Sequence, residues 1–344
     1  MYHSNDYVDF ITNLANSSST AADKEETRRR HAEFGIEEDC PVFRGLPEYT
    51  RLVAGATLTA VKTLTEGQAD VAICWDGGRH HAQKARASGF CYVADCVLAL
   101  LALKRVRVPS PDGTPPRRAR VLYLDLDLHF ADGVAQAFLH ANAGGAAPTL
   151  VTLSLHHAAP GVFPAVPLAA LSDADAPGAD ACTVCVPLAR GTGNAAFARV
   201  WRGVERVRAA LRPDFVVLQC GADGLAGDPC ALWNWALGGE GGLGWCVDRV
   251  CNAWGCKTLL LGGGGYNSPN VARAWTYLTS IALRQPLSLD SDIPDHNAFP
   301  LYAPSFTLDV PAGNAQDQNT EEYLQTVETR LDRVAEIIRQ RMGE

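Results

Sequence analysis

The sequence lacks long hydrophobic runs, internal repeats and an excess of basic residues. Nowhere do about 18 uncharged apolar residues follow one another, which a membrane-spanning helix requires. The first ten residues contain Asp6 and Asp9 and have no apolar signal core. The sequence therefore disfavours both secretion and membrane insertion.

Acidic residues outnumber basic ones: 38 Asp and Glu stand against 30 Lys and Arg, giving a net charge of −8. This charge disfavours attraction to nucleic-acid phosphates, so we expect no direct nucleic-acid partner and a basic substrate instead. The 11 cysteines are an odd number, and Cys74, Cys96 and Cys220 lie in apolar runs. This pattern favours buried free thiols in a reducing compartment over a disulfide framework.

Short runs rich in β-branched residues or Leu predict buried parallel strands at residues 71–74, 121–126, 150–155, 215–218 and 258–261. Apolar positions spaced by three and four from Phe197 to Leu211 predict a helix between two of these runs, and the same spacing predicts a helix at residues 321–342. Alternating strands and helices indicate an α/β layered fold. Residues 109–120 and 141–148 are rich in Pro, Arg, Gly or Ala and are expected to be surface loops.

Polar clusters follow four of the predicted strands, at residues 75–81, 125–129, 221–223 and 262–266. Ligands bind at the carboxyl ends of the strands in open parallel sheets. We therefore expect the four clusters to converge at one edge of the sheet.

Asp127 and His129 are two residues apart, so in an extended chain both side chains lie on one face, together with that of Asp125. Asp223 follows another strand and can supply a third ligand, which leaves the open position of a catalytic metal site. Two carboxylates and an imidazole favour zinc, although ferrous iron accepts the same set. The structural alternative is a polar strand end that only makes caps and hydrogen bonds.

His80 and His81 follow a Gly pair, which gives the backbone freedom to aim two imidazoles at a bound water. Asp125 and Asp132 can orient the two rings through their other nitrogen. Adjacent histidines are also common on protein surfaces, and the pair His156–His157 has the pattern of such a surface pair.

The Gly-rich segment 262–265 lacks the Lys-Ser or Lys-Thr of a phosphate-binding loop. It fits better as a loop that places Tyr266 where its phenol can donate to an oxyanion, and the alternative is a core Tyr with a satisfied hydroxyl. Cys182-x-x-Cys185 has no second ligand pair, so we interpret it as a coincidence of two thiols in a loop.

In their order and spacing these segments resemble the class I histone deacetylases, from about Tyr2 to the neighbourhood of Tyr302. Within that class the resemblance is to the histone deacetylase 8-like or fungal Hos1-like branch. The resemblance rests on GGRHHA (77–82), ASGFCY (87–92), DLDLH (125–129), QCGAD (219–223) with AGD (226–228), and GGGGYN (262–267). It implies one catalytic domain over residues 1–344, with a mostly parallel central sheet flanked by helices in a three-layer arginase/deacetylase fold. The family's usual amino-terminal strand and helix are expected to be absent.

The resemblance also implies roles for individual residues. The catalytic residues would be His80, His81, Tyr266, Asp125 and Asp132, and the zinc ligands would be Asp127, His129 and Asp223. The substrate-binding residues would be Asp39, Gly89, Phe90, Phe163 and Cys230, although Phe90 and Phe163 could also be ordinary core aromatics. A structural potassium ion would be held by Asp125, Asp127, His129, Ser154 and Leu155.

The implied activity is zinc-dependent hydrolysis of N6-acetyl-lysine in histone tails or other proteins, in the nucleus and also in the cytoplasm, with a role in repressing transcription. Pro229 and Pro269 stand where complex-forming relatives have Arg, so no inositol-phosphate corepressor complex is expected. Two other functions fit the same residues. One is an acetyl-lysine-binding module without turnover, and the other is an acetylpolyamine deacetylase.

Overall fold

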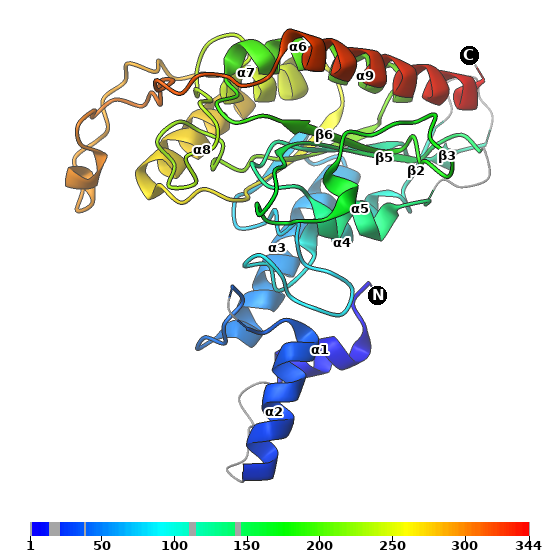
Figure 1. Cartoon of the computed structure of the whole chain (residues 1–344), viewed down its shortest axis with the longest axis vertical. Coiled ribbons are helices and arrows are strands. Elements are labelled where there is room, and N and C mark those ends of the chain that lie inside the picture. Colours follow the sequence, from blue (N-terminus) through cyan, green and yellow to red (C-terminus); the bar gives the residue numbers. More distant parts are fainter. Residues whose placement is uncertain (1, 14–20, 38, 110–114, 142–145, 344) are drawn as a thin grey trace.

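A six-stranded parallel sheet forms the centre of the computed structural model, which describes residues 2–13, 21–37, 39–109, 115–141 and 146–343 (Figure 1). The strand order is β1-β8-β7-β4-β5-β6, and every neighbouring pair is parallel. The strands are β1 (Val71–Cys74), β4 (Val121–Asp125), β5 (Leu150–His157), β6 (Thr183–Leu188), β7 (Phe215–Gln219) and β8 (Lys257–Leu261). The five predicted strands are confirmed, and the fold class is the expected one.

Strand β6 was not predicted, and the interpretation of the Cys182–Cys185 segment as a loop was wrong. Cys185 lies within β6 and Cys182 directly before it, and both thiols are buried. The run Thr183–Leu188 contains Pro187, which lowers the strand propensity of the segment. In the described part of the chain β6 is an edge strand with β5 as its one partner, so the missing N–H of Pro187 is tolerated there.

The segment 109–120 was expected to be a surface loop, but part of it forms a strand. Its described part contributes β3 (Arg117–Arg118), which pairs in antiparallel fashion with β2 (Arg107–Val108). Of the second predicted loop, 141–148, residues 142–145 lie outside the described residues.

Helices cover both faces of the central sheet (Figure 1). One face carries α6 (Asn194–Leu211), α7 (Leu243–Asp248), α8 (Ser268–Ala282) and α9 (Glu321–Met342), and the other carries α3 (Leu46–Thr65), α4 (Asp95–Leu103) and α5 (Asp132–Phe138). Helices α1 (Asn5–Thr12) and α2 (Ala21–Phe34) lie beyond α3, and a π-helical turn at Arg249–Ala253 follows α7. Short 3-10 turns occur at Pro167–Ala169 and Phe299–Tyr302. None of the described helices has the length and apolarity needed to cross a bilayer.

The sheet separates two hydrophobic cores, because successive side chains of a strand point to opposite faces. In β4, Leu122 and Leu124 pack into the core under α6 and α9, while Val121 and Tyr123 pack into the core under α3 and α4. Strands buried on both faces carry continuous apolar runs, which explains why these segments could be identified from sequence.

Helices α6 and α9 pack closely through a glycine. A Cβ atom at Gly203 of α6 would lie 2.7 Å from Cβ of Leu331 in α9, so only Gly allows this approach. The side chain of Thr320 caps the start of α9, accepting a hydrogen bond from the Tyr323 N–H at 3.1 Å. Helix α9 therefore docks on the sheet layer as the apolar spacing of residues 321–342 predicts.

Candidate metal centre and active site

The four polar clusters meet at the carboxyl edge of the sheet, as predicted. They follow β1, β4, β7 and β8, which lie side by side in the order β1-β8-β7-β4. Parallel strands all end on the same side, so the loops after them share one edge. This arrangement brings together residues that are almost 190 positions apart in the sequence.

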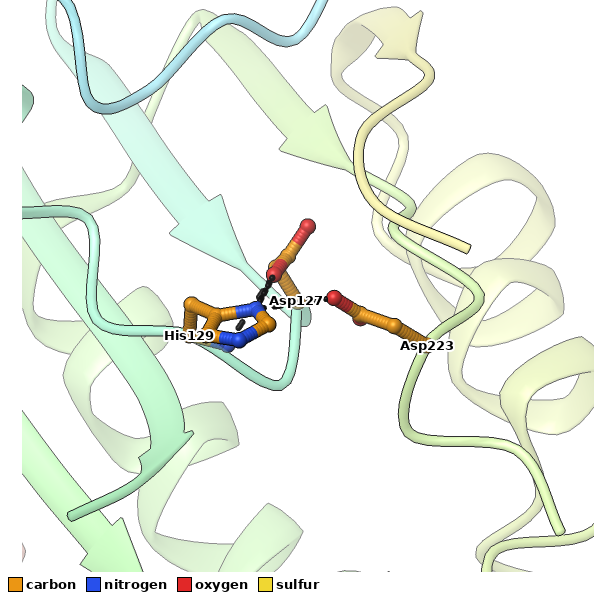
Figure 2. A group of neighbouring side chains, drawn as sticks. All are labelled: Asp127, His129 and Asp223. Atoms are coloured by element: carbon orange, nitrogen blue, oxygen red, sulfur yellow. Dashed lines mark hydrogen bonds and ion pairs between the residues drawn. The ribbon is translucent and has the colours of Figure 1, made fainter. Parts of the chain in front are cut away.

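Asp127, His129 and Asp223 form one group at this edge (Figure 2). One ligand atom from each residue lies within 4.8 Å of the others. His129 Nδ1 is 2.9 Å from Asp223 Oδ2 and 3.3 Å from Asp127 Oδ1. Both carboxylates are buried, and the imidazole is partly accessible. Three donors that point at one position, one of them open to solvent, suit a catalytic metal ion.

Hydrogen bonds from outside the group hold the two carboxylates in place. Asp127 Oδ2 accepts from Gln219 Nε2 at 2.8 Å and from the Gly264 N–H at 2.8 Å. Asp223 Oδ1 accepts from the Leu128 N–H at 2.9 Å. These donors occupy one oxygen of each carboxylate and leave the other directed toward His129, which orients the ligand set.

The electrostatics of this group call for a cation. Burial raises the pKa of Asp223, and the nearby charge of Asp127 raises it further. Burial lowers the pKa of His129, but the hydrogen bonds and charges of Asp127 and Asp223 outweigh it and raise that pKa to about 10. A proton on His129 therefore stands in for the positive charge that two adjacent buried carboxylates require, and a divalent ion would replace it.

His80 forms a buried pair with Asp125, as expected. Its Nδ1 donates to Asp125 Oδ2 at 2.9 Å, and the same oxygen accepts a hydrogen bond from the Tyr123 hydroxyl. Burial lowers the pKa of His80, but the charges of Asp125 and then Asp127 outweigh it and raise that pKa to about 9. The two carboxylates therefore favour the protonated form of His80, in which both ring nitrogens carry a proton.

His81 forms a second pair with Asp132 and has the opposite protonation. Its Nδ1 donates to Asp132 Oδ1 at 2.7 Å, and Gln83 Nε2 donates to the other oxygen at 3.3 Å. Burial, followed by the charge of His80, lowers the pKa of His81 to about 4. Because Nδ1 carries the only ring proton, Nε2 of His81 is free to accept one.

Two cavities meet at the metal group. The outer one has a volume of about 490 Å³, and its lining includes Asp39, Phe90, Phe163 and Tyr266. The inner one has a volume of about 250 Å³, and its lining includes Asp127, His129, His80 and Arg79. His81, Gly89, Phe90, His129 and Tyr266 line both. The two cavities therefore form a passage from the surface to the candidate metal ligands.

Phe90 and Phe163 are wall residues of this passage and not core aromatics, since 54% and 41% of their surfaces are exposed. Gly89 lies between them in a left-handed conformation with φ of 54°, and a Cβ there would lie 2.6 Å from the His81 ring and 2.7 Å from Phe163. Asp39 Oδ2 accepts the Gly89 N–H at 2.6 Å. Asp39 thus fixes the rim segment that shapes the passage.

Tyr266 lies at the entrance, with its ring 6.4 Å from the His129 ring. Burial, followed by the charge of Asp127, raises the pKa of Tyr266, so its hydroxyl keeps its proton and can donate a hydrogen bond. Asp228 Oδ2 accepts the Tyr266 N–H at 2.7 Å, and its Oδ1 accepts the Cys230 N–H at 2.9 Å. Cys230 is half-buried and does not belong to the described lining of either cavity.

The residues suggested for a monovalent cation lie close to the metal group. In the β4–β5 register Asp125 pairs with Ser154, and Leu155 follows in β5. The Ser154 hydroxyl lies 3.0 Å from His156 Nδ1. Asp125, Ser154 and Leu155 are buried.

The pair His156–His157 is not a surface pair, so that prediction was wrong. Both residues end strand β5 and are buried. His156 Nε2 donates to the Ala169 carbonyl at 2.9 Å and His157 Nδ1 to the Leu188 carbonyl at 2.8 Å. Backbone carbonyls therefore satisfy these imidazoles, which the sequence pattern does not reveal.

The sequence analysis gave no role to four supporting residues, Tyr123, Gln219, Asp228 and Arg79, although the last three lie in segments that carry the family resemblance. Tyr123 and Gln219 are polar groups within apolar strands, and this contrast was a usable signal. Asp228 is a buried carboxylate in a loop, and no sequence pattern marks it as a support for Tyr266. Arg79 directly precedes His80 in the sequence and, like His80, lines the inner cavity.

The arrangement of these groups suits the hydrolysis of a carbonyl compound. It combines a position for a Lewis-acidic ion, a neutral imidazole that can accept a proton, a phenol that can donate to an oxyanion, and a narrow passage with aromatic walls. An extended side chain that ends in a carbonyl group would fit such a passage.

Comparisons with known proteins point to one family. A family model described as "Histone deacetylase domain" matches residues 1–282. Histone deacetylase 8 of Xenopus laevis is 39% identical over 307 residues, which cover 88% of this chain and 87% of that protein. Histone deacetylase 8 of Danio rerio is 37% identical over 328 residues, which cover 95% of this chain and 79% of that protein. Histone deacetylase 1 of Homo sapiens is 35% identical over 96% of this chain, which spans 62% of that relative.

Proposed function

The chain belongs to the histone deacetylase family, in its class I, histone deacetylase 8-like branch, and is a lysine deacetylase; we propose that Asp127, His129 and Asp223 hold zinc for this reaction. The family match does not favour an acetylpolyamine deacetylase or a binding module without turnover. The proposal is supported by the grouping of Asp127, His129 and Asp223 beside two His–Asp pairs, whose imidazoles line the inner cavity together with Asp127 and His129.

The donor set fits zinc. Asp127 and Asp223 would each supply a carboxylate oxygen and His129 an imidazole nitrogen, a donor set that zinc accepts in catalytic sites, and a dication would offset the charge of buried carboxylates. When bound, zinc would supply a Lewis acid that polarises the acetyl carbonyl and lowers the pKa of a water molecule. Ferrous iron remains the second candidate, because it accepts the same ligands.

His81 is the proposed proton carrier. Its unprotonated Nε2 accepts a proton from the water that attacks the amide carbon, while Asp132 stabilises the resulting imidazolium. The same proton then passes to the lysine nitrogen as the C–N bond breaks, so acetate and free lysine leave. The charge of Asp125 favours a proton on His80, which would stabilise the negative charge that develops beside it.

Tyr266 is the proposed oxyanion donor, and the aromatic walls select the substrate. The Tyr266 phenol donates to the oxygen of the tetrahedral intermediate. Phe90 and Phe163 flank the aliphatic stem of acetyl-lysine in the outer cavity. Asp39, which already holds the Gly89 N–H, sits at the rim where a substrate backbone would pass.

We further propose that the substrates are acetylated histone tails or other acetyl-lysine proteins, and that the protein acts in the nucleus in repressing transcription. The relatives' name, histone deacetylase, supports the substrate class. A potassium ion bound by Asp125, Asp127, His129, Ser154 and Leu155 is part of the same proposal, supported by the register that pairs Asp125 with Ser154.

The decisive experiment measures acetate released from an acetyl-lysine peptide by the purified protein equilibrated with zinc. We expect turnover that a strong chelator abolishes and that added zinc restores. Tight peptide binding without acetate release, with zinc fully bound, would identify a binding module. Faster release from an acetylated polyamine than from the peptide would instead identify a polyamine deacetylase.

A further inference from the structure

A basic surface lies at the end of the sheet opposite the active site. It consists of Lys104, Arg105, Arg107, Arg117, Arg118 and Arg120, which come from the end of α4, the β2–β3 pair and the segment that leads into β4. Arg105, Arg107 and Arg118 are exposed, and the other three are partly buried. We call this set the β2–β3 surface. Its charge contrasts with the net −8 of the whole chain.

Like charges are crowded on this surface. The β2–β3 register places Arg107 directly opposite Arg118, a pairing that destabilises an antiparallel strand pair. Burial lowers the pKa of Lys104, and the charge of Arg118 lowers it further. Burial also lowers the pKa of Arg120, followed by the charge of Arg117. Cations that lower one another's pKa lie close enough to share one anionic ligand.

Within the two segments that form this surface, one described carboxylate offsets part of the charge. Of the described residues in segments 104–120 and 212–214, Asp214 alone is acidic. Its two oxygens are taken up by Arg117, at 2.7 and 2.8 Å, and by the Arg120 N–H at 2.7 Å. The Arg120 Nε is buried and has no hydrogen-bond partner among the described residues. The surface therefore keeps donors and positive charge that Asp214 does not satisfy.

The composition of the surface favours a polyanion over a folded protein partner. Protein interfaces are anchored by exposed aromatic or large aliphatic side chains. No exposed large hydrophobic residue occurs in the described parts of segments 104–120 and 212–214. Guanidinium groups bind phosphate oxygens in bidentate fashion, and five of the six basic residues are Arg.

The position of the surface leaves the active site free. Arg120 precedes Val121, the first residue of β4, whereas Asp127 follows the last residue of that strand. A strand of five residues spans about 17 Å at its rise of about 3.3 Å per residue. A ligand bound at the β2–β3 surface would therefore not compete with acetyl-lysine.

We propose that the β2–β3 surface binds the phosphodiester backbone of duplex DNA, through Arg105, Arg107 and Arg118. The overall charge of −8 predicts weak nucleic-acid binding only when charge is averaged over the molecule. The contacts are to phosphates, so binding is independent of base sequence and falls steeply with salt. An enzyme that binds DNA this way stays near DNA-associated substrates without losing access to its active site.

The test measures the anisotropy of a short labelled DNA duplex titrated with the full chain at several salt concentrations. Three phosphate contacts predict a slope of log K against log salt of about −2.7, which is about a 40-fold loss of affinity between about 50 and 200 mM salt. The variant Arg107→Ser/Arg118→Ser should reduce the slope to about −0.9. Arg44→Ser/Arg51→Ser is the matched control, because it removes the same charge from exposed positions elsewhere.

Acetate release from a free peptide checks that the Arg107→Ser/Arg118→Ser variant is folded, and it should match that of the unsubstituted protein. If this variant misfolds, the single variant Arg105→Ser should still reduce the slope by about 0.9. An unchanged slope, an equal change in the control variant, or displacement of DNA by polyglutamate at equal charge would overturn the proposal. DNA binding is measured without substrate, so the result does not depend on the deacetylase activity.

Discussion

The residue Gln219 offers the sharpest test of how the ligand set is held. It is fully buried at the end of β7, and its Nε2 donates to Asp127 Oδ2 at 2.8 Å. Its Oε1 accepts the Gly221 N–H at 2.8 Å, which fixes the amide orientation. The substitution Gln219→Met keeps the length of the side chain and removes the donor. Asp127 then keeps the Gly264 N–H as the remaining donor to this oxygen.

The substitution removes one of the two hydrogen bonds that Asp127 Oδ2 accepts. Removing such a partner weakens metal affinity by about 10- to 100-fold, or about 1.4 to 2.7 kcal/mol. The Gly221 N–H also loses its acceptor, so the free energy of unfolding should decrease by about 1 to 3 kcal/mol. The two effects are separable because only the first depends on zinc.

Competition with a chelator of known affinity measures the zinc dissociation constant, and thermal unfolding of the zinc-free protein measures the second effect. Gln83→Met is the matched control. Gln83 also donates to a carboxylate, that of Asp132 at 3.3 Å, but this carboxylate supports His81 and not the ligands. A zinc affinity of Gln219→Met within about twofold of the unsubstituted protein, or an equal loss in Gln83→Met, would refute the assignment of Gln219 as a support for the metal ligand.

Three further predictions address catalysis, packing and pH. Tyr266→Phe should lower kcat by about 10²- to 10³-fold with little change in zinc affinity, and an unchanged kcat in peptide deacetylation would remove Tyr266 from the oxyanion role. Gly203→Ala should destabilise the protein by about 1 kcal/mol in denaturant unfolding, since the clash with Leu331 exceeds the gain in helix propensity, whereas in a Leu331→Gly background, which removes the opposing Cβ, the same change should stabilise. Burial lowers the pKa of His156 in the folded protein to about 4, whereas in the unfolded chain the imidazole has its ordinary pKa of about 6.5. Between these two values only the unfolded state binds a proton at His156. The free energy of unfolding should therefore fall by up to about 3 kcal/mol as pH falls from about 6.5 to 4. His156→Gln should remove that loss, and parallel stability curves for the two proteins would contradict it.

The fold was predictable where a single physical rule decides the pattern. Strands covered on both faces must be apolar at every position, which is why β4 and β7 were predicted at nearly their observed bounds. Helix α9 covers one face only, and its apolar spacing identified the whole of Glu321–Met342. The edge strand β6 was missed because it contains Pro187, whose cost depends on whether the strand has a second neighbour.

The site was predictable only as a set of residue types. The spacing of Asp127 and His129 placed both on one face, and the position of Asp223 after another strand made it the candidate third ligand. The family resemblance then assigned all three to zinc. The sequence contains no information that His156 would find the Ala169 carbonyl at 2.9 Å, because this contact depends on how the loop after β5 returns to the sheet. For the same reason a buried His pair and a surface His pair have the same sequence pattern.

The contrast between His80 and His81 shows what only the assembled structure determines. The two rings are adjacent in sequence, lie 4.0 Å apart, are both buried, and each donates to a carboxylate. Their pKa values nevertheless move in opposite directions. Burial lowers both pKa values, but for His80 the charges of Asp125 and Asp127 outweigh burial, whereas for His81 the charge of His80 adds to burial and Asp132 does not offset the two. A proton on His80 therefore favours the neutral form of His81. The ability of His81 to accept a proton thus depends on the whole cluster. Replacing Asp125 would change the pKa of His81 through His80, although Asp125 is not the carboxylate that His81 hydrogen-bonds.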